Sequence, residues 1–386
     1  MKILILSTPS MPLPPVGYAG IEHVVYDLEE GLVKKGHDVT AYATGDSKIS
    51  GKLAFFYKVA LSASVKLTYN PYYFLNHVYH FMLYIKDKNF DIIHLNDAGR
   101  FSLYFSEFIQ SPFVTTLHGS YYHDREDPYG ILDSKREQLM FFKHFPYVSI
   151  SNTQRKALPD LNYVATVYNS IRLEDFDFSQ KGGDYIAWMG RVTAAKGLDT
   201  AIKITQKLDK KILAYGFVDI GELAYFNNTI KPLLAYKGSE FHGEAKSKQE
   251  KSNLFSNSRL LLFPIRWDEP FGIVMVEAMT TGTPVAAFAK GSVPEVIKDG
   301  QTGFIVNPSD DDIRGNWIIK KTGMEGLCEA VERIYSMPDD KYTKMRLACR
   351  DHVAKNFTAE KMVDGYERVY EKILSGNPIG ANHIFV

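Results

Sequence analysis

The sequence predicts two α/β domains of the Rossmann type, each built on a doubly wound parallel sheet, facing each other across a cleft. The chain has 386 residues, which is long for one hydrophobic core and sufficient for two. Short apolar runs alternate with amphipathic stretches, a pattern typical of parallel sheets with helices on both faces. This rhythm weakens through the polar residues 170–184 and then starts again. We therefore expect an N-terminal domain over residues 1–169 and a C-terminal domain over residues 170–357.

The N-terminal half contains a series of apolar runs that we predict to be strands. Residues 2–7 form the first run, and a loop rich in Pro and Gly follows it. Apolar side chains from Ile21 to Leu32 then recur at helical spacing, and Gly36 ends this helix. The later predicted strands of this half are residues 39–43, 92–95, 114–117, 147–150 and 164–168.

The C-terminal half repeats the pattern. Its predicted strands are residues 185–189, 212–215, 260–263, 285–287 and 304–306. After Pro308 the sequence favours helices over residues 324–335, 341–356 and 358–374, whereas residues 310–322 form a loop or insertion without an assignable pattern. Ligands of such sheets bind beyond the carboxyl ends of the strands, so polar residues at those ends are the candidates for a site.

The composition excludes several classes of protein. Lys and Arg together number 45, as do Asp and Glu, so no net charge favours binding to nucleic acid. Cys328 and Cys349 are too few and too far apart for a disulfide framework or a metal knuckle, which indicates a reducing compartment. The first apolar run is too short for a signal peptide, and no later run is long enough to span a membrane. We expect a cytoplasmic protein.

Two cations follow the first predicted strand of the C-terminal domain. Arg191 lies at the carboxyl end of that strand, and Lys196 stands directly before Gly197 and a predicted helix. Arg offers a planar fork for phosphate oxygens and Lys a mobile point charge, so the two together suit a diphosphate. Two solvated charges on a loop are the alternative, but their position at a strand end favours the first interpretation.

Two glutamates surround the start of a later helix. Glu277 lies among apolar residues, so a buried carboxylate there needs hydrogen-bond donors such as ribose hydroxyls, or else a paired Lys or Arg. Glu269 precedes the helix in a loop with Pro270 and Gly272. Unpaired amides at a helix start favour an anion or a polarised sugar oxygen, although an acid there can also simply complement the helix dipole.

Two features of the N-terminal domain are weaker signals. The loop of residues 12–20 contains Gly17 and Gly20, which would allow a phosphate to approach the backbone closely. His118 follows the predicted strand 114–117, where an imidazole can donate to a sugar hydroxyl. A glycine loop that binds nothing and a structural histidine are the alternatives.

These residues stand in the order found in retaining glycosyltransferases of family four, which the chain resembles over nearly its whole length. The paired glutamates together with Arg191 and Lys196 carry the resemblance most specifically. Supporting segments are the glycine loop before Ile21, and residues 117–119, 149–155, 282–285 and 293–296. Residues 266–272, followed by 290–295, look most like the avilamycin-pathway branch of that family.

The resemblance implies a GT-B fold and a set of roles. Arg191 and Lys196 would bind the donor diphosphate, Glu277 the ribose hydroxyls, and Glu269 the donor sugar, while His118 would contact that sugar near its reacting face. The remaining donor-binding residues would be Gly20, Gly243, Phe271, Gly272, Ile273 and Val274. The family's last helix usually crosses back onto the first domain, a role for residues from about 358 to 386.

The implied reaction transfers a hexose from a nucleoside-diphosphate sugar to an acceptor hydroxyl with retained configuration. Negative charge would develop on the leaving phosphate, where Arg191, Lys196 and the helix-start amides stabilise it. No residue presents itself as a covalent nucleophile, and no Asp-x-Asp pair occupies a crevice position, so we expect front-face substitution without a metal or other cofactor. A UDP-sugar such as UDP-glucose is the first expectation for the donor, and a GDP-sugar is next.

The acceptor is expected on the N-terminal domain. Tyr121, Tyr122 and Arg125 follow His118 closely and would line that side of the site. Residues 55–84 are rich in aromatic side chains, and two helices covering the sheet would explain them. The alternative is an apolar and basic face for a lipid-linked acceptor, or for peripheral contact with the inner face of the membrane.

The sequence leaves two other functions open. A nucleotide-sugar epimerase would share the two-domain architecture but would form a sugar epimer without an acceptor. A non-catalytic nucleotide-sugar-binding subunit would bind donors without transfer, and the presence of both glutamates and both cations disfavours it. The sequence identifies neither the acceptor nor the oligomeric state.

Overall fold

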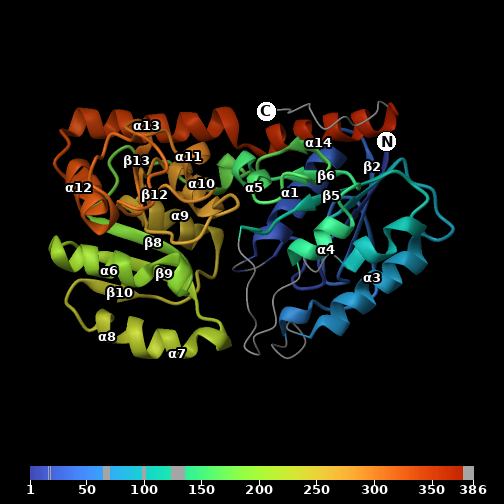
Figure 1. The fold of residues 1–386 in the computed structure, drawn as a ribbon, viewed down its shortest axis with the longest axis horizontal. Coiled ribbons are helices and arrows are strands. Elements are labelled where there is room, and N and C mark those ends of the chain that lie inside the picture. The colour runs from blue at the N-terminus through green and yellow to red at the C-terminus, as the bar shows by residue number, and fades with distance from the viewer. Residues whose placement is uncertain (16, 18, 64–69, 98–100, 123–134, 377–386) are drawn as a thin grey trace. The chain divides into compact units, whose positions relative to one another are not determined.

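The computed structural model describes residues 1–15, 17, 19–63, 70–97, 101–122 and 135–376, which fall into two compact units. The N-terminal unit consists of Met1–Ser170 and Ala359–Val386, and the C-terminal unit of Ile171–Thr358. Each unit contains a parallel sheet packed between helices, as the alternation of apolar and amphipathic stretches predicts (Figure 1). No helix in these described ranges combines the length and apolarity needed to cross a membrane.

The sheet of the N-terminal unit runs in the order β3-β2-β1-β4-β5-β6-β7, and its described neighbours pair in parallel. The order reverses between β1 and β4, so the crevice of this sheet lies at the carboxyl ends of those two strands. The strands are β1 Lys2–Leu6, β2 Asp38–Ala43, β3 Lys52–Phe55, β4 Ile92–Leu95, β5 Phe113–Leu117, β6 Tyr147–Ser149 and β7 Tyr163–Thr166.

Helices cover both faces of this sheet. They are α1 Gly20–Lys34, α3 Pro71–Ile85, α4 Lys135–Phe141, α5 Asn152–Lys156 and α14 Ala359–Leu374, with 3-10 turns η1 Leu61–Ala63 and η2 Phe101–Phe108. On one face α1 packs against α14, and Gly31 permits the approach because a Cβ there would lie 2.4 Å from Val363 Cγ2. On the other face α3 buries Val78 and Phe81 against β1 and β4.

The sheet of the C-terminal unit runs in the order β10-β9-β8-β11-β12-β13, again in parallel. Its strands are β8 Tyr185–Arg191, β9 Ile212–Phe217, β10 Ser239–Phe241, β11 Ser258–Phe263, β12 Val285–Phe288 and β13 Gly303–Val306. The longer helices are α6 Leu198–Lys207, α9 Lys248–Ser256, α10 Ile273–Thr280, α12 Gly323–Tyr335 and α13 Asp339–Asn356. The shorter ones are η3 Leu173–Asp175, η4 Ala194–Lys196, η5 Ile220–Glu222, α7 Leu223–Tyr225, the π-helix η6 Phe226–Ile230, α8 Lys231–Leu234 and α11 Val293–Val296.

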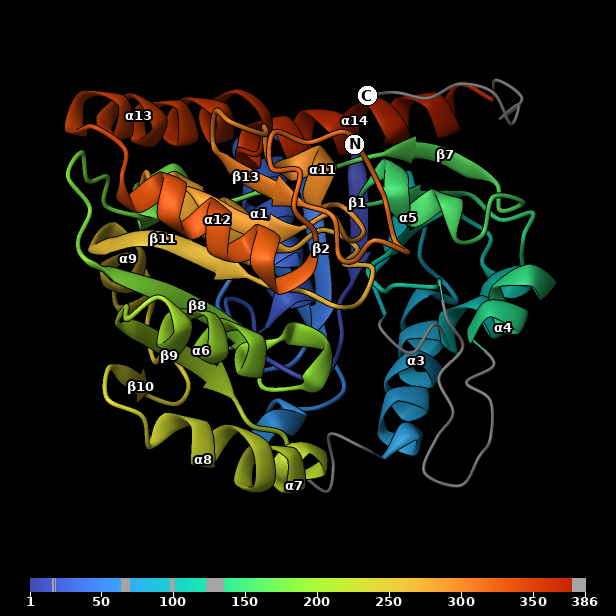
Figure 2. The ribbon, with the colours of Figure 1, turned by 60° about the vertical axis from the view of Figure 1, so that its left-hand side comes forward.

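The strongest apolar runs of this half meet in one core. Figure 2 shows α6 and α12 side by side on one face of the sheet. Both helices bury apolar side chains against β8 and β11, with Trp188 among the residues fully removed from water. This packing fixes the strand ends that carry the charged loops.

Two segments differ in part from what the sequence suggests. In the described part of residues 55–84, α3 is a helix and Phe55 ends the edge strand β3. The prediction of two helices also involves residues 64–69, which lie outside the described residues. That strand has four residues and buries only Ala54, so it lacks the continuous apolar run of an inner strand. Residues 170–184 are packed and do not form a free linker, because Ile171 and Phe176 are buried and Arg350 donates to the carbonyl oxygens of Leu173 and Phe176 at 3.1 Å.

Two histidines of the N-terminal unit are fully buried. His77 on α3 lies with its Nε2 3.1 Å from the carbonyl oxygen of Ser7. His94 on β4 lies between Tyr370 Oη at 2.8 Å and Thr116 Oγ1 at 2.7 Å. Burial lowers the pKa of His77 from 6.5 to about 4 and that of His94 to about 3, so both are neutral in the folded protein near pH 7.

Because these two histidines are buried in the neutral form, we expect the folded protein to lose stability in mild acid. Between pH 6.5 and 4 the unfolded chain takes up protons that buried His77 does not, so the free energy of unfolding falls as the pH falls, by about 3 kcal/mol for this residue at pH 4. His77→Gln retains a donor toward Ser7 but does not titrate, and we expect a shallower decline. Urea unfolding at pH 7, 6 and 5 measures it. The exposed His144→Gln serves as control, and identical pH dependence in wild type and His77→Gln would contradict the account.

Candidate functional site

The candidate site lies where two neighbouring strands of the C-terminal sheet end. β8 and β11 pair in parallel, so their carboxyl ends point to the same edge. Arg191 is the last residue of β8 and Lys196 lies in the segment that follows it, while the loop after β11 contains residues 264–272. The order of the strands thus brings together two segments that are far apart in the sequence.

Lys196 and Glu269 meet at this edge. Lys196 Nζ forms an ion pair with Glu269 Oε2, and their side chains are 14% and 9% exposed. Trp267 Nε1 donates to the same oxygen at 2.8 Å, and Lys196 Nζ lies 4.9 Å from the centre of the Trp267 ring. A cation, a carboxylate and an indole therefore form one compact group at the strand ends. Sequence reasoning assigned no role to Trp267, although a Trp two residues before a site carboxylate is within reach of it.

The backbone around Lys196 is fixed from both loops. Gly197 has φ of 73°, and a Cβ there would lie 2.2 Å from the carbonyl oxygen of Pro264. Position 197 therefore requires a glycine, because the loop after β11 approaches it so closely. Arg266 donates from its main-chain nitrogen to Ala195 at 2.8 Å. Its guanidinium donates to Asp199 at 2.7 Å and to the carbonyl oxygen of Ala194 at 3.0 Å. Arg266 was not predicted as a site residue, because its partners become visible only in the folded structure.

Arg191 and the start of α10 complete this edge. Arg191 is the last residue of β8 and is exposed, opposite Phe217 of β9. Phe271 is buried, Gly272 precedes α10, and Ile273 and Val274 are its first two residues. The structure therefore places the predicted helix-start residues directly after Glu269, and their amides form the amino end of α10.

Glu277 has a protein partner. It lies on α10 with 8% exposure, and Lys251 Nζ on α9 donates to its Oε1 at 3.1 Å. The sequence left open whether a ligand hydroxyl or a paired Lys or Arg satisfies this carboxylate, and the structure contains a paired lysine. A ribose contact by Glu277 stays a prediction.

Two of the three predicted glycines, Gly20 and Gly243, lie where a Cβ would meet no described atom. Gly20 begins α1 of the N-terminal unit, and no described atom lies within 4 Å of a Cβ built on it. Gly243 follows β10 in the C-terminal unit, and its carbonyl oxygen accepts from the main-chain nitrogen of Gly216 at 2.7 Å. A Cβ at Gly243 would also meet no described atom within 4 Å, but its φ of 73° favours glycine for the backbone alone.

The remaining predicted residues belong to the N-terminal unit. His118 follows β5, its Nε2 is 2.9 Å from Asn96 Oδ1, and burial lowers its pKa to about 4. Tyr121 is buried in the core beside Leu117, and the hydroxyl of Tyr122 donates to the carbonyl oxygen of Thr153, so both rings are engaged in packing. Arg125 lies outside the described residues.

One acid of the N-terminal unit was not assigned a role. Glu22 lies in the first turn of α1 with 5% exposure, and the hydroxyl of Thr8 donates to it. Burial raises the pKa of this carboxyl above the usual range, so Glu22 keeps its proton to a higher pH than an exposed glutamate does. The signal in the sequence was an acid directly after the glycine loop. Within the described ranges, no cluster of three His, Cys, Asp or Glu side chains has the geometry to hold a metal ion.

Both units match sequence models of glycosyltransferase families. Residues 18–213 match the sequence model of the family described as Glycosyltransferase Family 4, and residues 172–338 match that of Glycosyl transferases group 1. The chain is 25% identical to N-acetyl-alpha-D-glucosaminyl L-malate synthase of Bacillus anthracis over 95% of this chain and 97% of that protein. It is 28% identical to an uncharacterized 41.2 kDa protein from the cps region of Klebsiella pneumoniae, over 54% of this chain and about half (55%) of that relative.

Solved structures share the fold. A sucrose-phosphate synthase from Thermosynechococcus elongatus superposes with a TM-score of 0.78 at 18% identity, covering 97% of this chain and 99% of the other. HepE from Anabaena, in complex with UDP and glucose, gives 0.71 at 16% identity over 96% and 100%. AviGT4, a glycosyltransferase involved in avilamycin A biosynthesis, gives 0.64 at 17% over 97% and 98%. At these identities the likeness concerns the fold, which is GT-B with two Rossmann-like domains.

The geometry of Gly197 predicts that Gly197→Ala destabilises the C-terminal unit. The left-handed backbone and the overlap with Pro264 should cost at least about 1–2 kcal/mol of unfolding free energy. Urea unfolding measures the loss. Gly221→Ala is the matched control, since a Cβ at Gly221 meets nothing within 4 Å. Equal stability of the two variants would contradict the close contact between the loops.

Proposed function

This chain belongs to Glycosyltransferase Family 4, and we propose that it transfers a hexose from a nucleoside-diphosphate sugar to an acceptor hydroxyl with retained configuration. Membership in the family makes it a glycosyltransferase. It disfavours the epimerase and the non-catalytic subunit. The single observation that carries the proposal is the group of Lys196, Trp267 and Glu269 at the strand ends, directly before the amino end of α10.

In this proposal the cations bind the donor diphosphate. Lys196 is already oriented by Glu269 and Trp267, so the cation is preorganised, and Arg191 at the end of β8 contributes a second positive charge. As the bond to the anomeric carbon breaks, negative charge grows on the leaving phosphate. Fixed cations and helix-start amides stabilise that charge most in the transition state. The same cations would do this without a metal ion.

The glutamates bind hydroxyls in this proposal. Glu269 keeps a second carboxylate oxygen beside the one shared by Lys196 and Trp267, and this oxygen accepts from the donor sugar. Glu277 accepts from the ribose, while Lys251 donates to its Oε1. The negative charge of Glu269 is already paired with Lys196, which makes this carboxylate a poorer nucleophile. The pairing therefore supports front-face substitution over attack by Glu269 on the anomeric carbon. His118, neutral near pH 7, contacts the sugar from the N-terminal unit.

A UDP-sugar is the first donor to test and a GDP-sugar the second. HepE, with the same fold, binds UDP and glucose, which supports this order. Residues 266–272 support a place near the avilamycin-pathway branch, with the product a glycan or glycoconjugate. A thermal-shift panel of nucleoside diphosphates and their sugars tests donor binding, because a ligand at a hundredfold its dissociation constant adds about 2.7 kcal/mol of stability. No shift with any sugar nucleotide would contradict the proposal.

Lys196→Ala should lower turnover by about 100- to 1000-fold at saturating donor, because one charge-stabilising contact is lost from the transition state. Release of nucleoside diphosphate from the best donor of the panel measures it. Lys203→Ala is the control, since Lys203 lies on the next helix, is half exposed, and pairs only loosely with Asp199 at 3.6 Å. Near-normal turnover of Lys196→Ala would remove Lys196 from this role.

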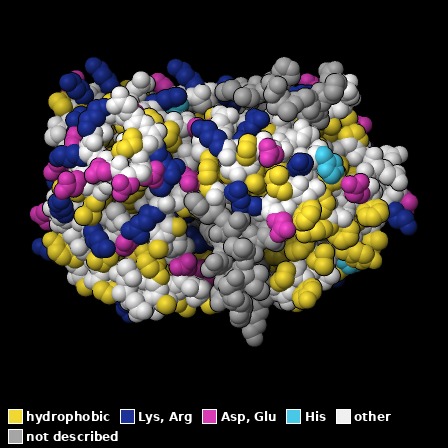
Figure 3. Space-filling view, in the orientation of Figure 1, with side chains coloured by type: hydrophobic (Ala, Val, Ile, Leu, Met, Phe, Trp, Pro, Cys, Tyr) yellow, Lys and Arg dark blue, Asp and Glu magenta, His cyan; other side chains and the backbone are white. Residues whose placement is uncertain are grey.

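We further propose that the N-terminal unit contacts a membrane surface that carries the acceptor. Figure 3 shows apolar side chains gathered over α3. They include Tyr79, Leu83 and Phe108, which are at least half exposed and line a groove together with Lys86 and Lys88. Apolar side chains flanked by lysines suit the boundary between head groups and acyl chains.

Substitution of Leu83 and Phe108 by Ser should weaken binding to vesicles that contain anionic lipid. The reason is that two exposed apolar side chains no longer enter the bilayer surface. Co-sedimentation with such vesicles measures the bound fraction. Ile220→Ser is the control, because the exposure of Ile220 lies between those of Leu83 and Phe108 but the residue belongs to the C-terminal unit. Equal binding of all three proteins would contradict the membrane contact.

A further inference from the structure

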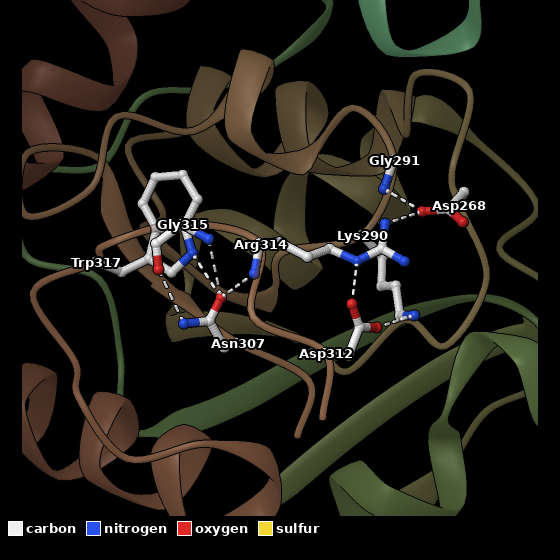
Figure 4. Close-up of polar contacts among 8 residues, drawn as sticks. All are labelled: Asp268, Lys290, Gly291, Asn307, Asp312, Arg314, Gly315 and Trp317. Atoms are coloured by element: carbon white, nitrogen blue, oxygen red, sulfur yellow. Dashed lines mark hydrogen bonds and ion pairs between the residues drawn. The ribbon is translucent and has the colours of Figure 1, made fainter. Parts of the chain in front are cut away.

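Residues 307–322 connect β13 to α12 and are held in place by side-chain hydrogen bonds (Figure 4). The side chain of Asn307 makes several of these bonds. The side-chain oxygen of Asn307 accepts from the main-chain nitrogens of Arg314 at 2.8 Å and Gly315 at 3.2 Å, and from Trp317 Nε1 at 3.1 Å. Its amide nitrogen donates to the carbonyl oxygen of Gly315 at 2.9 Å. One buried amide therefore fixes the turn from which Arg314 projects.

Arg314 joins this segment to the loop that carries Glu269. Its Nη1 forms an ion pair with Asp268, and its Nε donates to Asp312 Oδ1 at 2.7 Å. Lys290 pairs with the other oxygen of Asp312. Figure 4 shows these four side chains in a row of alternating charge, Lys290, Asp312, Arg314 and Asp268. The row ends on the residue directly before Glu269.

Asp268 and the backbone of Glu269 are held from two sides. The Asp268 side chain is 4% exposed, and its Oδ1 accepts from the main-chain nitrogen of Gly291 at 2.9 Å. A Cβ at Gly291 would lie 2.2 Å from the carbonyl oxygen of Glu269, and Ser292 donates to that oxygen at 2.8 Å. Residues 290–292 thus support one side of the loop, and Arg314 compensates the buried charge on the other. A carboxylate so buried is costly without a cation.

We propose that Arg314 is a positioning residue for the donor sugar, acting through Asp268 on the orientation of Glu269. This inference rests on the proposed function, in which Glu269 binds the sugar and Lys196 the diphosphate. Without Arg314, the buried carboxylate of Asp268 loses the cation that pairs with it. Because a buried charge is then better solvated nearer to water, the backbone of residues 268–269 shifts outward. The backbone at Lys196 is held separately, through Gly197 and the main chain of Arg266, so the ammonium stays within reach of the diphosphate when Glu269 moves. Arg314 therefore sets affinity for the sugar part of the donor and not for its nucleotide part.

The experiment compares two ligands on the full chain. Isothermal titration measures the dissociation constants of UDP-glucose and UDP, or of the sugar nucleotide and diphosphate that the panel selects. For Arg314→Ala the constant for the sugar nucleotide should rise by about tenfold, as expected for a lost charged hydrogen bond, while that for the diphosphate stays within twofold. Lys320→Ala is the matched control, because Lys320 lies on the same segment and contacts Asn316 and Trp317 within it.

A second variant tests the route through Asp268. Asp268→Asn removes the charge that Arg314 compensates, so adding Arg314→Ala in that background should change the ratio of the two constants by less than twofold. Hydrogen exchange gives a readout that needs no ligand. The amides of Glu269 and of residues 271–273 should exchange faster in Arg314→Ala than in wild type or Lys320→Ala.

The outcomes separate the inference from the function on which it rests. Equal weakening of both ligands by Arg314→Ala, or no change in either, overturns the positioning role. An undiminished effect of Arg314→Ala in the Asp268→Asn background overturns the route through Asp268. A wild-type protein that binds no sugar nucleotide overturns the proposed function, and the exchange rates of residues 269–273 then decide whether Arg314 positions this loop.

Discussion

The parallel pairing of β8 with β11 is the constraint on which the candidate site depends. It brings Lys196 and Glu269, 73 positions apart in the chain, to one sheet edge, where they form an ion pair. A partly buried pair of this kind is costly to break, since each charge has left bulk water. The glycine at 197 and the contacts of Arg266 matter because they hold the two loops at the distance that the pair requires.

Three of the charged side chains in and around the candidate site are paired within the C-terminal unit. Lys196 pairs with Glu269, Lys251 with Glu277, and Arg314 with Asp268. A diphosphate that enters such a site adds negative charge to cations already fixed in place. Little reorganisation is then needed when further charge develops on a leaving group, which is the condition for strong electrostatic stabilisation.

The sequence predicted what depends on local pattern. Continuous apolar runs identified the inner strands, and charges in the segments after them pointed to Lys196 and Glu269, which the structure brings together. The edge strand β3 was missed because it is short and half exposed. The roles of Arg266 and Arg314 were missed for a different reason: their partners Asp199 and Asp268 lie 67 and 46 positions away, and nothing in the local sequence encodes such a pairing. Tyr121 was expected near the acceptor, yet its ring fills the core.

The return of α14 to the N-terminal unit has a consequence for synthesis of the chain. Tyr370 reaches buried His94, Tyr366 reaches Thr116, and Val363 fills the gap left by Gly31. These partners emerge from the ribosome only after the whole C-terminal unit has been made. Part of one face of the first sheet therefore stays uncovered until α14 is made, while the second sheet can close on its own. The later-made half can thus reach its native packing before the earlier one, a reversal of the usual vectorial order.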